Sequence, residues 1–246
     1  MSGTEQADDL RALMRVPWHW EWVPQTGPGQ AEHREWTARV VALFEAWTAE
    51  GLDAGRAAWP AAAGTPFPFT AGMLGREAAG WLGERAAALP PWARLAWGAA
   101  FLGGRPRWAP VPVVVEFAEP EAEDPNYLME TVGARGMEGD AREPVVDYVT
   151  TAIGDGLRVF ALCRSPEGAA CARLHAALRL DVPPRGGVAS VSTDVLLSTL
   201  VFETGLMAVI GDGVEQLMQQ IAEECAPADA GPARLGFLAA TQEGQS

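Results

Sequence analysis

Residues 171–182 constrain the fold of this chain most strongly, because apolar side chains recur there at every second position. An extended strand points alternate side chains to opposite faces of a sheet. One face would carry the apolar residues Ala172, Leu174, Ala176, Leu178, Leu180 and Val182. The other face would carry Arg173, His175, Arg179 and Asp181. The segment therefore predicts a strand of an antiparallel sheet with one buried face, and Arg173, His175 and Arg179 mark its polar face.

Short runs rich in β-branched residues surround this strand in the sequence and predict its neighbours in the sheet. Between two of these runs stands Gly154-Asp155-Gly156, whose glycines would supply the positive-φ positions of a tight hairpin turn. After residue 182 the chain would turn at Pro183–Gly187 and return to the sheet. The expected strands are 111–117, 145–153, 157–163, 188–202 and 206–210.

An amphipathic helix is predicted near the C-terminus. Its apolar stripe is formed by Val214, Leu217, Met218 and Ile221. Asp212 and Glu215 have the spacing of a capping box at its start, with Asp in the place of the usual Ser or Thr. The tail over 227–246 contains glycine and proline and is expected to be flexible.

The first 108 residues differ in composition from the rest of the chain, since all ten tryptophans lie there. Helical spacing of apolar residues predicts helices over 35–49 and 73–89, and the second ends at Pro90-Pro91. The apolar segment 92–102 fits either a helix or a buried strand. Charge changes at the same boundary: ten Arg and eleven acids give −1 before residue 109, eight Arg and twenty-one acids give −13 after it, and together these make the total of −14.

These patterns predict an α+β fold, in which an antiparallel sheet of about five to seven strands packs against the C-terminal helix. We expect a Trp-rich, mainly helical region over 1–108, the sheet and terminal helix over 109–226, and the tail over 227–246, with the first two regions forming one compact unit. A curved antiparallel sheet followed by a long amphipathic helix is similar in plan to the helix-grip ligand-binding fold and to the Mog1/PsbP-like sandwich. The likeness is one of architecture alone.

The acidic balance of the chain argues against binding to nucleic acid or to an anionic membrane. The chain has no lysine, which removes Schiff-base catalysis and lysine-dependent phosphate loops from consideration. Arginine supplies all eighteen cations, a bias typical of GC-rich genes, and we interpret the source as an actinobacterium. Three cysteines without framework spacing, a polar N-terminus and no apolar run of about 20 residues predict a cytoplasmic protein with reduced thiols.

Residues with the spacing of a catalytic or metal site are not apparent. The segment 19–33 holds two histidines and two carboxylates, but their spacing fits no common zinc site. Cys171 and His175 lie four residues apart on one predicted strand, about 13 Å, which is too far for a Cys–His pair. The sequence therefore predicts no catalytic residue, no cofactor and no metal.

One aromatic segment, residues 17–24, stands out. It places Trp18, Trp20 and Trp22 at every second position between two prolines, with His19 and Glu21 on the other, outward face of an extended strand. These tryptophans would either strap the core closed or form a recognition surface, and the many other tryptophans of this region favour the strap.

Two classes of function remain open. The absence of a nucleophile–base pair favours a non-catalytic interaction or accessory protein that binds a protein partner or a second copy of itself. Acidic loops over 119–124 and 138–143 would then steer a basic surface toward it. The alternative is a domain that binds a small apolar ligand, with or without catalysis, in a cavity between the sheet and the C-terminal helix.

Overall fold

The computed structural model describes residues 18–25, 30–60, 64–102, 105–106, 110–165, 167–182 and 190–226. The chain divides into two compact units. The first consists of Met1–Leu89 and Ala99–Arg107, and the second of Pro90–Gly98 and Trp108–Ser246. Strand β2 (Ala93–Leu102), which the sequence left open between helix and strand, contributes residues to both units.

The first unit contains the two predicted helices, which the structure extends or shifts to α2 (Ala31–Ala57) and α3 (Ala71–Ala87). Gly75 of α3 allows the two helices to approach closely, because a Cβ there would lie 2.9 Å from the Cα of Val41. Thr70 caps α3, since its side chain accepts a hydrogen bond from the Met73 amide. The unit also contains β1 (Trp18–Trp22) and the short β3 (Arg105–Pro106), which pairs with the end of β2.

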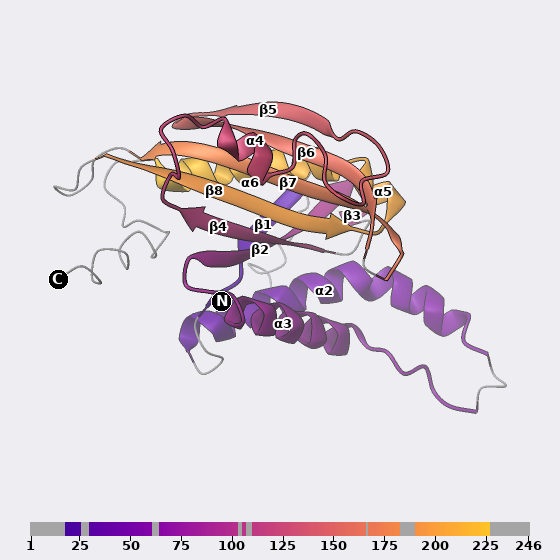
Figure 1. The fold of residues 1–246 in the computed structure, drawn as a ribbon. Coiled ribbons are helices and arrows are strands. Elements are labelled where there is room, and N and C mark those ends of the chain that lie inside the picture. Colours follow the sequence, from indigo (N-terminus) through magenta and orange to yellow (C-terminus); the bar gives the residue numbers. More distant parts are fainter. Residues whose placement is uncertain are drawn as a thin grey trace. The chain divides into compact units, whose positions relative to one another are not determined.

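The second unit contains an antiparallel sheet in the order β2-β4-β8-β7-β6-β5 (Figure 1). The remaining strands are β4 (Val111–Ala118), β5 (Val145–Thr151), β6 (Gly154–Arg164), β7 (Ala170–Val182) and β8 (Val191–Val201). Long strands β6, β7 and β8 pair along most of their lengths and form the centre of the sheet. The predicted α+β fold, with an antiparallel sheet and a C-terminal helix packed on it, is confirmed.

Opposite faces of this sheet carry different helices, as Figure 1 shows. Helix α6 (Ile210–Cys225) contacts β5, β6 and β7 on one face. The short α4 (Tyr127–Thr131) covers the other face, where Leu128 and Val132 pack against Leu157, Val159 and Ala177. The predicted alternation of β7 is confirmed: its even-numbered residues from 172 to 180 are buried on the α6 face, and Arg173, His175 and Arg179 lie on the α4 face.

The expected Gly154-Asp155-Gly156 turn is wrong. The hairpin turns at Ala152 and Ile153, and the two glycines belong to β6 and do not have positive φ. Their role is close strand packing, because a Cβ on Gly154 would lie 1.9 Å from the Arg179 carbonyl oxygen and one on Gly156 would lie 2.2 Å from that of Ala177.

The expected strand over 206–210 is also wrong. Leu206 and Met207 end α5 (Thr204–Met207), Ala208 and Val209 form a turn, and Ile210 begins α6. Leu206 and Ile210 are buried at a helical spacing of four residues, which a short apolar run does not distinguish from a strand.

The apolar stripe of α6 is confirmed, and all four of its residues are buried. The expected capping box is wrong, because α6 begins at Ile210 and places Asp212 inside its first turn. Asp212 and Glu215 instead form ion pairs with Arg158 of β6, at 3.5 and 3.4 Å. The expected turn at 183–187 and the tail over 227–246 lie outside the described residues.

Candidate functional site

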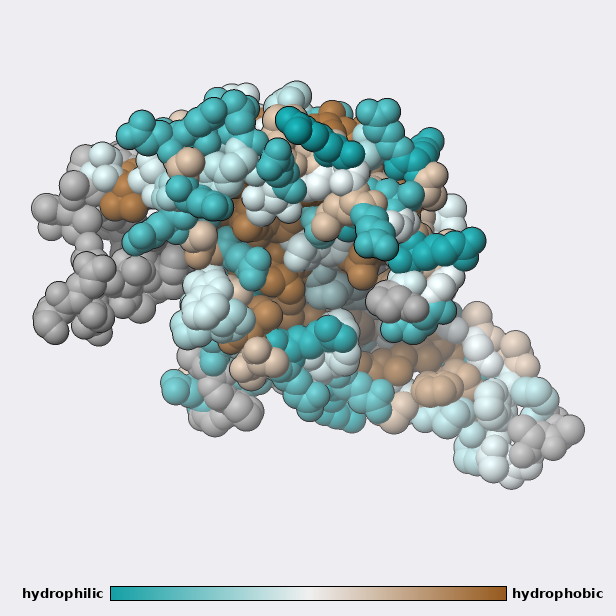
Figure 2. Space-filling model, viewed as in Figure 1, coloured by the Kyte–Doolittle hydropathy of each residue, from teal (hydrophilic) through white to brown (hydrophobic). Residues whose placement is uncertain are grey.

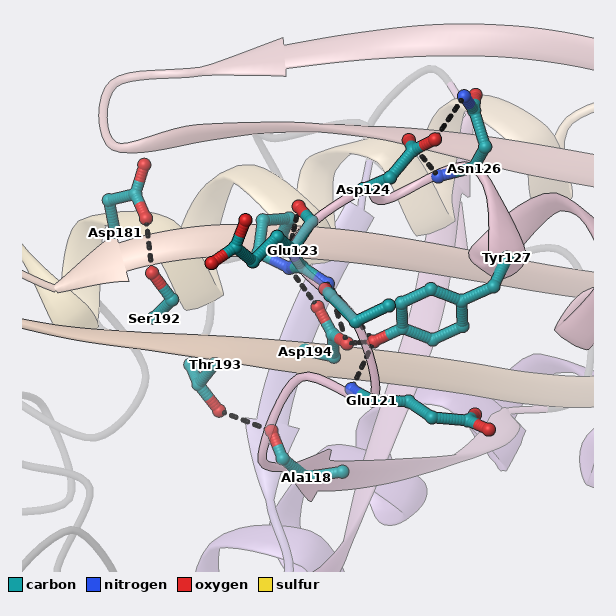
Figure 3. Close-up of polar contacts among 12 residues, drawn as sticks. Ala118, Glu121, Glu123, Asp124, Asn126, Tyr127, Asp181, Ser192, Thr193 and Asp194 are labelled. Atoms are coloured by element: carbon teal, nitrogen blue, oxygen red, sulfur yellow. Dashed lines mark hydrogen bonds and ion pairs between the residues drawn. The ribbon is translucent and has the colours of Figure 1, made fainter.

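The α4 face of β7 carries a first charged cluster around Arg179 (Figure 3). Its guanidinium pairs with the carboxylate of Asp194 on β8, whose side chain is only 3% exposed. The Tyr127 hydroxyl donates to the same carboxylate and accepts a 3.0 Å hydrogen bond from Arg179. The bond to Asp194 is the main reason why the pKa of Arg179 is raised.

The Arg179 cluster also fixes the acidic loop over 119–124. Arg179 donates to the carbonyl oxygens of Ala122 and Glu123, both at 3.2 Å. The Glu121 amide donates to the Tyr127 hydroxyl at 2.8 Å, as Figure 3 shows. The polar groups of this cluster satisfy one another's hydrogen-bonding capacity, and their bonds hold the loop against the sheet.

A second cluster surrounds Arg173, which lies on the same face of β7, six residues before Arg179. Arg173 donates to both carboxylate oxygens of Asp140, at 3.1 and 2.8 Å, and to the carbonyl oxygen of Val132 at 3.2 Å. The same guanidinium lies 3.2 Å from Nδ1 of His175. Because arginine has no acceptor, Nδ1 must accept this bond, and the imidazole proton is then on Nε2.

This arrangement does not suit His175 as a general base. Ser198 lies directly opposite His175 on β8 and would be the nearest hydroxyl in register. A base would need a free lone pair on one ring nitrogen, but Arg173 uses the lone pair of Nδ1, and Nε2 carries the proton. Burial, followed by the charge of Arg173, lowers the pKa of His175 and keeps the ring neutral.

Cys171 lies on the same face of β7 as His175, but its partner is another thiol. Cys163 lies directly opposite on β6, and the two sulfur atoms are 3.3 Å apart. Burial, followed by contact with Cys163, raises the pKa of the Cys171 thiol to about 11. The sequence did not predict this pair. The signal was that Cys163 and Cys171 lie at equal distances on either side of the turn between β6 and β7, so an antiparallel hairpin brings them opposite each other.

The aromatic strand β1 belongs to the first unit. Trp18 and Trp20 are buried, at 4% and 5% exposure, as a strap requires, whereas Trp22 is half-buried. His19 and Glu21 are half-buried instead of facing outward, and Glu21 pairs with Arg39 of α2. Burial is the main cause that lowers the pKa of His19 and raises that of Glu21. Whether the tryptophans strap the core or bind a partner stays a prediction.

Strand β5 lies at the end of the strand order and pairs only with β6 among the described strands. The Thr150 carbonyl oxygen accepts a 2.8 Å bond from the Gln219 side chain of α6, so it points away from β6. In an antiparallel pair the main-chain groups of alternate residues point the same way. The N–H and C=O groups of Val146 and Tyr148 therefore form an outer edge, beside a Tyr148 side chain that is 75% exposed.

Acidic residues surround this edge on the α6 face. Arg158 of β6 is the common partner of Asp147, Asp212 and Glu215, at 3.3 to 3.5 Å. Three carboxylates around one guanidinium leave a local charge of −2. Hydrophilic residues also predominate in the upper part of Figure 2, where β5 and α4 lie.

Comparison of the chain with protein-family models, with curated proteins and with solved structures found no match. Within the described ranges, no group of three or more His, Cys, Asp and Glu residues is placed to hold a metal ion. None of the helices in the described part of the chain combines the length and apolar character needed to cross a membrane.

Proposed function

We propose that this protein is a non-catalytic interaction or accessory protein whose strand β5 receives an extended, basic segment of a partner protein. The observation that carries the proposal is the outer edge of β5, where Val146 and Tyr148 direct main-chain donors and acceptors away from β6. An added strand would pair with these groups and extend the sheet.

The composition of β5 supports this role. Sheet edges are commonly protected from pairing by proline, lysine or a bulge. Strand β5 contains no proline, and its one charged residue, Asp147, faces Arg158. Gln219 occupies the carbonyl of Thr150, whereas among the described residues no main-chain partner faces the outward groups of Val146 and Tyr148.

The charge around β5 favours a basic partner over a second copy of the chain. Two copies paired edge to edge would each bring the excess of two negative charges around Arg158. Like charges across an interface oppose association, whereas a basic segment would neutralise them and be steered toward the edge. The exposed acidic loops over 119–124 and 138–143 add to the same field.

The polar clusters support a non-catalytic role. Arg179 and Arg173 are both paired with carboxylates, and the Nδ1 lone pair of His175 is occupied by Arg173. These side chains hold loops on the sheet, as the contacts of Arg179 with the 119–124 loop illustrate.

Binding of a short synthetic peptide that alternates arginine with valine tests the proposal. We expect saturable binding that weakens with salt and slows hydrogen exchange at Val146 and Tyr148. Tyr148→Pro removes the central outward N–H and should abolish binding. Tyr148→Thr, the matched control, keeps the N–H and should bind more weakly but measurably. Circular dichroism and melting of both variants establish that they are folded.

Three results would overturn the proposal. If a peptide with glutamate in place of arginine bound as tightly as the arginine peptide, the partner would not be selected by its positive charge. If the folded Tyr148→Pro variant bound the peptide as tightly as the unmodified chain, the outer edge of β5 would not be the binding site. If sedimentation showed a dimer and Tyr148→Pro made it a monomer, a second copy of the chain would be the partner that pairs with β5. An apolar molecule that co-purifies in native mass spectrometry would instead support ligand binding beneath α6, where Ile210, Met218 and Leu174 are at most 1% exposed.

A further inference from the structure

We propose that Cys163 and Cys171 form a dithiol that peroxide oxidises to an intrachain disulfide across the β6–β7 hairpin. The two residues are direct partners in the antiparallel register, and their sulfur atoms are 3.3 Å apart. Both side chains lie on the α4 face of the sheet, and no other residue separates the two thiols along the strands.

The backbone register is compatible with a disulfide. At both ends of the hairpin, odd-numbered residues exchange main-chain bonds: the Asp181 amide donates to the Ile153 carbonyl, and the Ser165 amide donates to the Ala169 carbonyl, both at 2.8 Å. By the same alternation, Cys163 and Cys171 form a hydrogen-bonded pair, a class of antiparallel pair whose Cα atoms are typically about 5.5 Å apart. This separation falls inside the range of about 4.4–6.8 Å observed for disulfides.

The two thiols differ in exposure, and this difference assigns their roles. Cys163 is half-buried, whereas Cys171 is 2% exposed. Peroxide therefore reaches Cys163 first, and Cys171 resolves the intermediate. The third cysteine, Cys225, is buried on α6, which packs against the opposite face of the sheet.

The reaction consumes one peroxide and releases two waters. The Cys163 thiolate attacks one oxygen of hydrogen peroxide, the O–O bond breaks, and the leaving hydroxide takes a proton to become water. The product is a sulfenic acid on Cys163. The Cys171 sulfur then attacks the Cys163 sulfur, the S–O bond breaks, and the departing hydroxyl leaves as water with the Cys171 proton. Peroxide is reduced, and the two thiols are oxidised by two electrons in total.

The strands hold the sulfur atoms at this distance before any oxidant arrives. Rotation of the two side chains must bring the sulfurs from 3.3 Å to the bond length of about 2.05 Å, with the main-chain ladder in place. The bridge would be reversible by a thiol reductant, because the half-buried Cys163 sulfur stays within reach of it.

Mass spectrometry of the full chain, reduced, freed of reductant and treated with hydrogen peroxide, tests the inference. We expect the folded protein to lose the mass of two hydrogen atoms and two free thiols together. Peptide mapping should assign the bridge to Cys163 and Cys171, and dithiothreitol should restore both thiols. Cys225→Ala, the matched control, should behave as the unmodified chain does.

Single variants separate the bridge from other oxidation. In Cys163→Ser the intrachain product should disappear, and in Cys171→Ala the remaining Cys163 should gain oxygen instead. If Cys171→Ala does not fold, Cys163→Ser at the half-buried position carries the test. Oxygen added to Cys163 of the unmodified chain without a bridge, or a bridge that includes Cys225, would overturn the inference. Neither result depends on β5, so the proposed function is tested separately.

Discussion

Removing the carboxylate of Asp194 tests how the second unit holds its acidic loop. In Asp194→Ala the Arg179 guanidinium, 15% exposed, loses its charged partner while it stays beneath the 119–124 loop. Breaking a buried ion pair from one side costs about 3–5 kcal/mol. Partial exposure of Arg179 lets water relieve some of this cost, so we expect about 3 kcal/mol of lost stability.

Two controls isolate the effect of the ion pair. Asp181→Ala removes an exposed carboxylate that accepts a bond from Ser192, its direct partner on β8, two residues from the Arg179–Asp194 pair, and should cost below about 1 kcal/mol. Replacing both partners, as Arg179→Met with Asp194→Val, leaves no unpaired charge and should recover part of the loss, since the bonds from Arg179 to the 119–124 loop are still absent.

Hydrogen exchange of amides in β7 and β8 is the suitable assay for Asp194→Ala. Tryptophan fluorescence would not report on β7 and β8 directly, because neither strand contains a tryptophan and seven of the ten lie in the first unit. The free energy of opening at β7 and β8 should fall in Asp194→Ala and change little in Asp181→Ala. Equal, small effects of the two substitutions would refute the assignment of Arg179 and Asp194 as the anchor of the loop.

Four further substitutions test the packing and electrostatics. Gly156→Ala places a methyl group against a neighbouring carbonyl and should destabilise β6 in hydrogen exchange, whereas Gly80→Ala, in open space on α3, should stabilise its helix by about 0.5–1 kcal/mol in urea unfolding. Trp20→Ala should cost about 3–5 kcal/mol with unchanged sedimentation if β1 straps the core, and a normal melting curve would contradict the strap. His175 has a pKa below its ordinary 6.5, so the unfolded chain binds more protons and stability falls as pH drops below 6.5; His175→Gln should flatten that slope, and an unchanged slope would exclude the histidine as its source.

Local patterns predicted the elements whose side chains repeat with a regular period. The two-residue alternation of 171–182 identified β7 and its faces, because successive side chains of a strand point to opposite faces and only the apolar set can be buried. The stripe from Val214 to Ile221 identified α6 for the same reason at helical spacing. Where the apolar run was short, as at 206–210, the period was insufficient to separate helix from strand.

The sequence by itself therefore determined the fold class, the polar face with Arg173, His175 and Arg179, and the acidity of the second half. The tertiary structure decided their partners, since Asp194 and Tyr127 come from 15 and 52 residues away from Arg179. It also decided that Gly154 and Gly156 lie within a strand, that Cys163 meets Cys171, and that β5 is left at the edge. Strand order and register follow from which faces are buried together across the whole sheet, and no local run of residues contains that information.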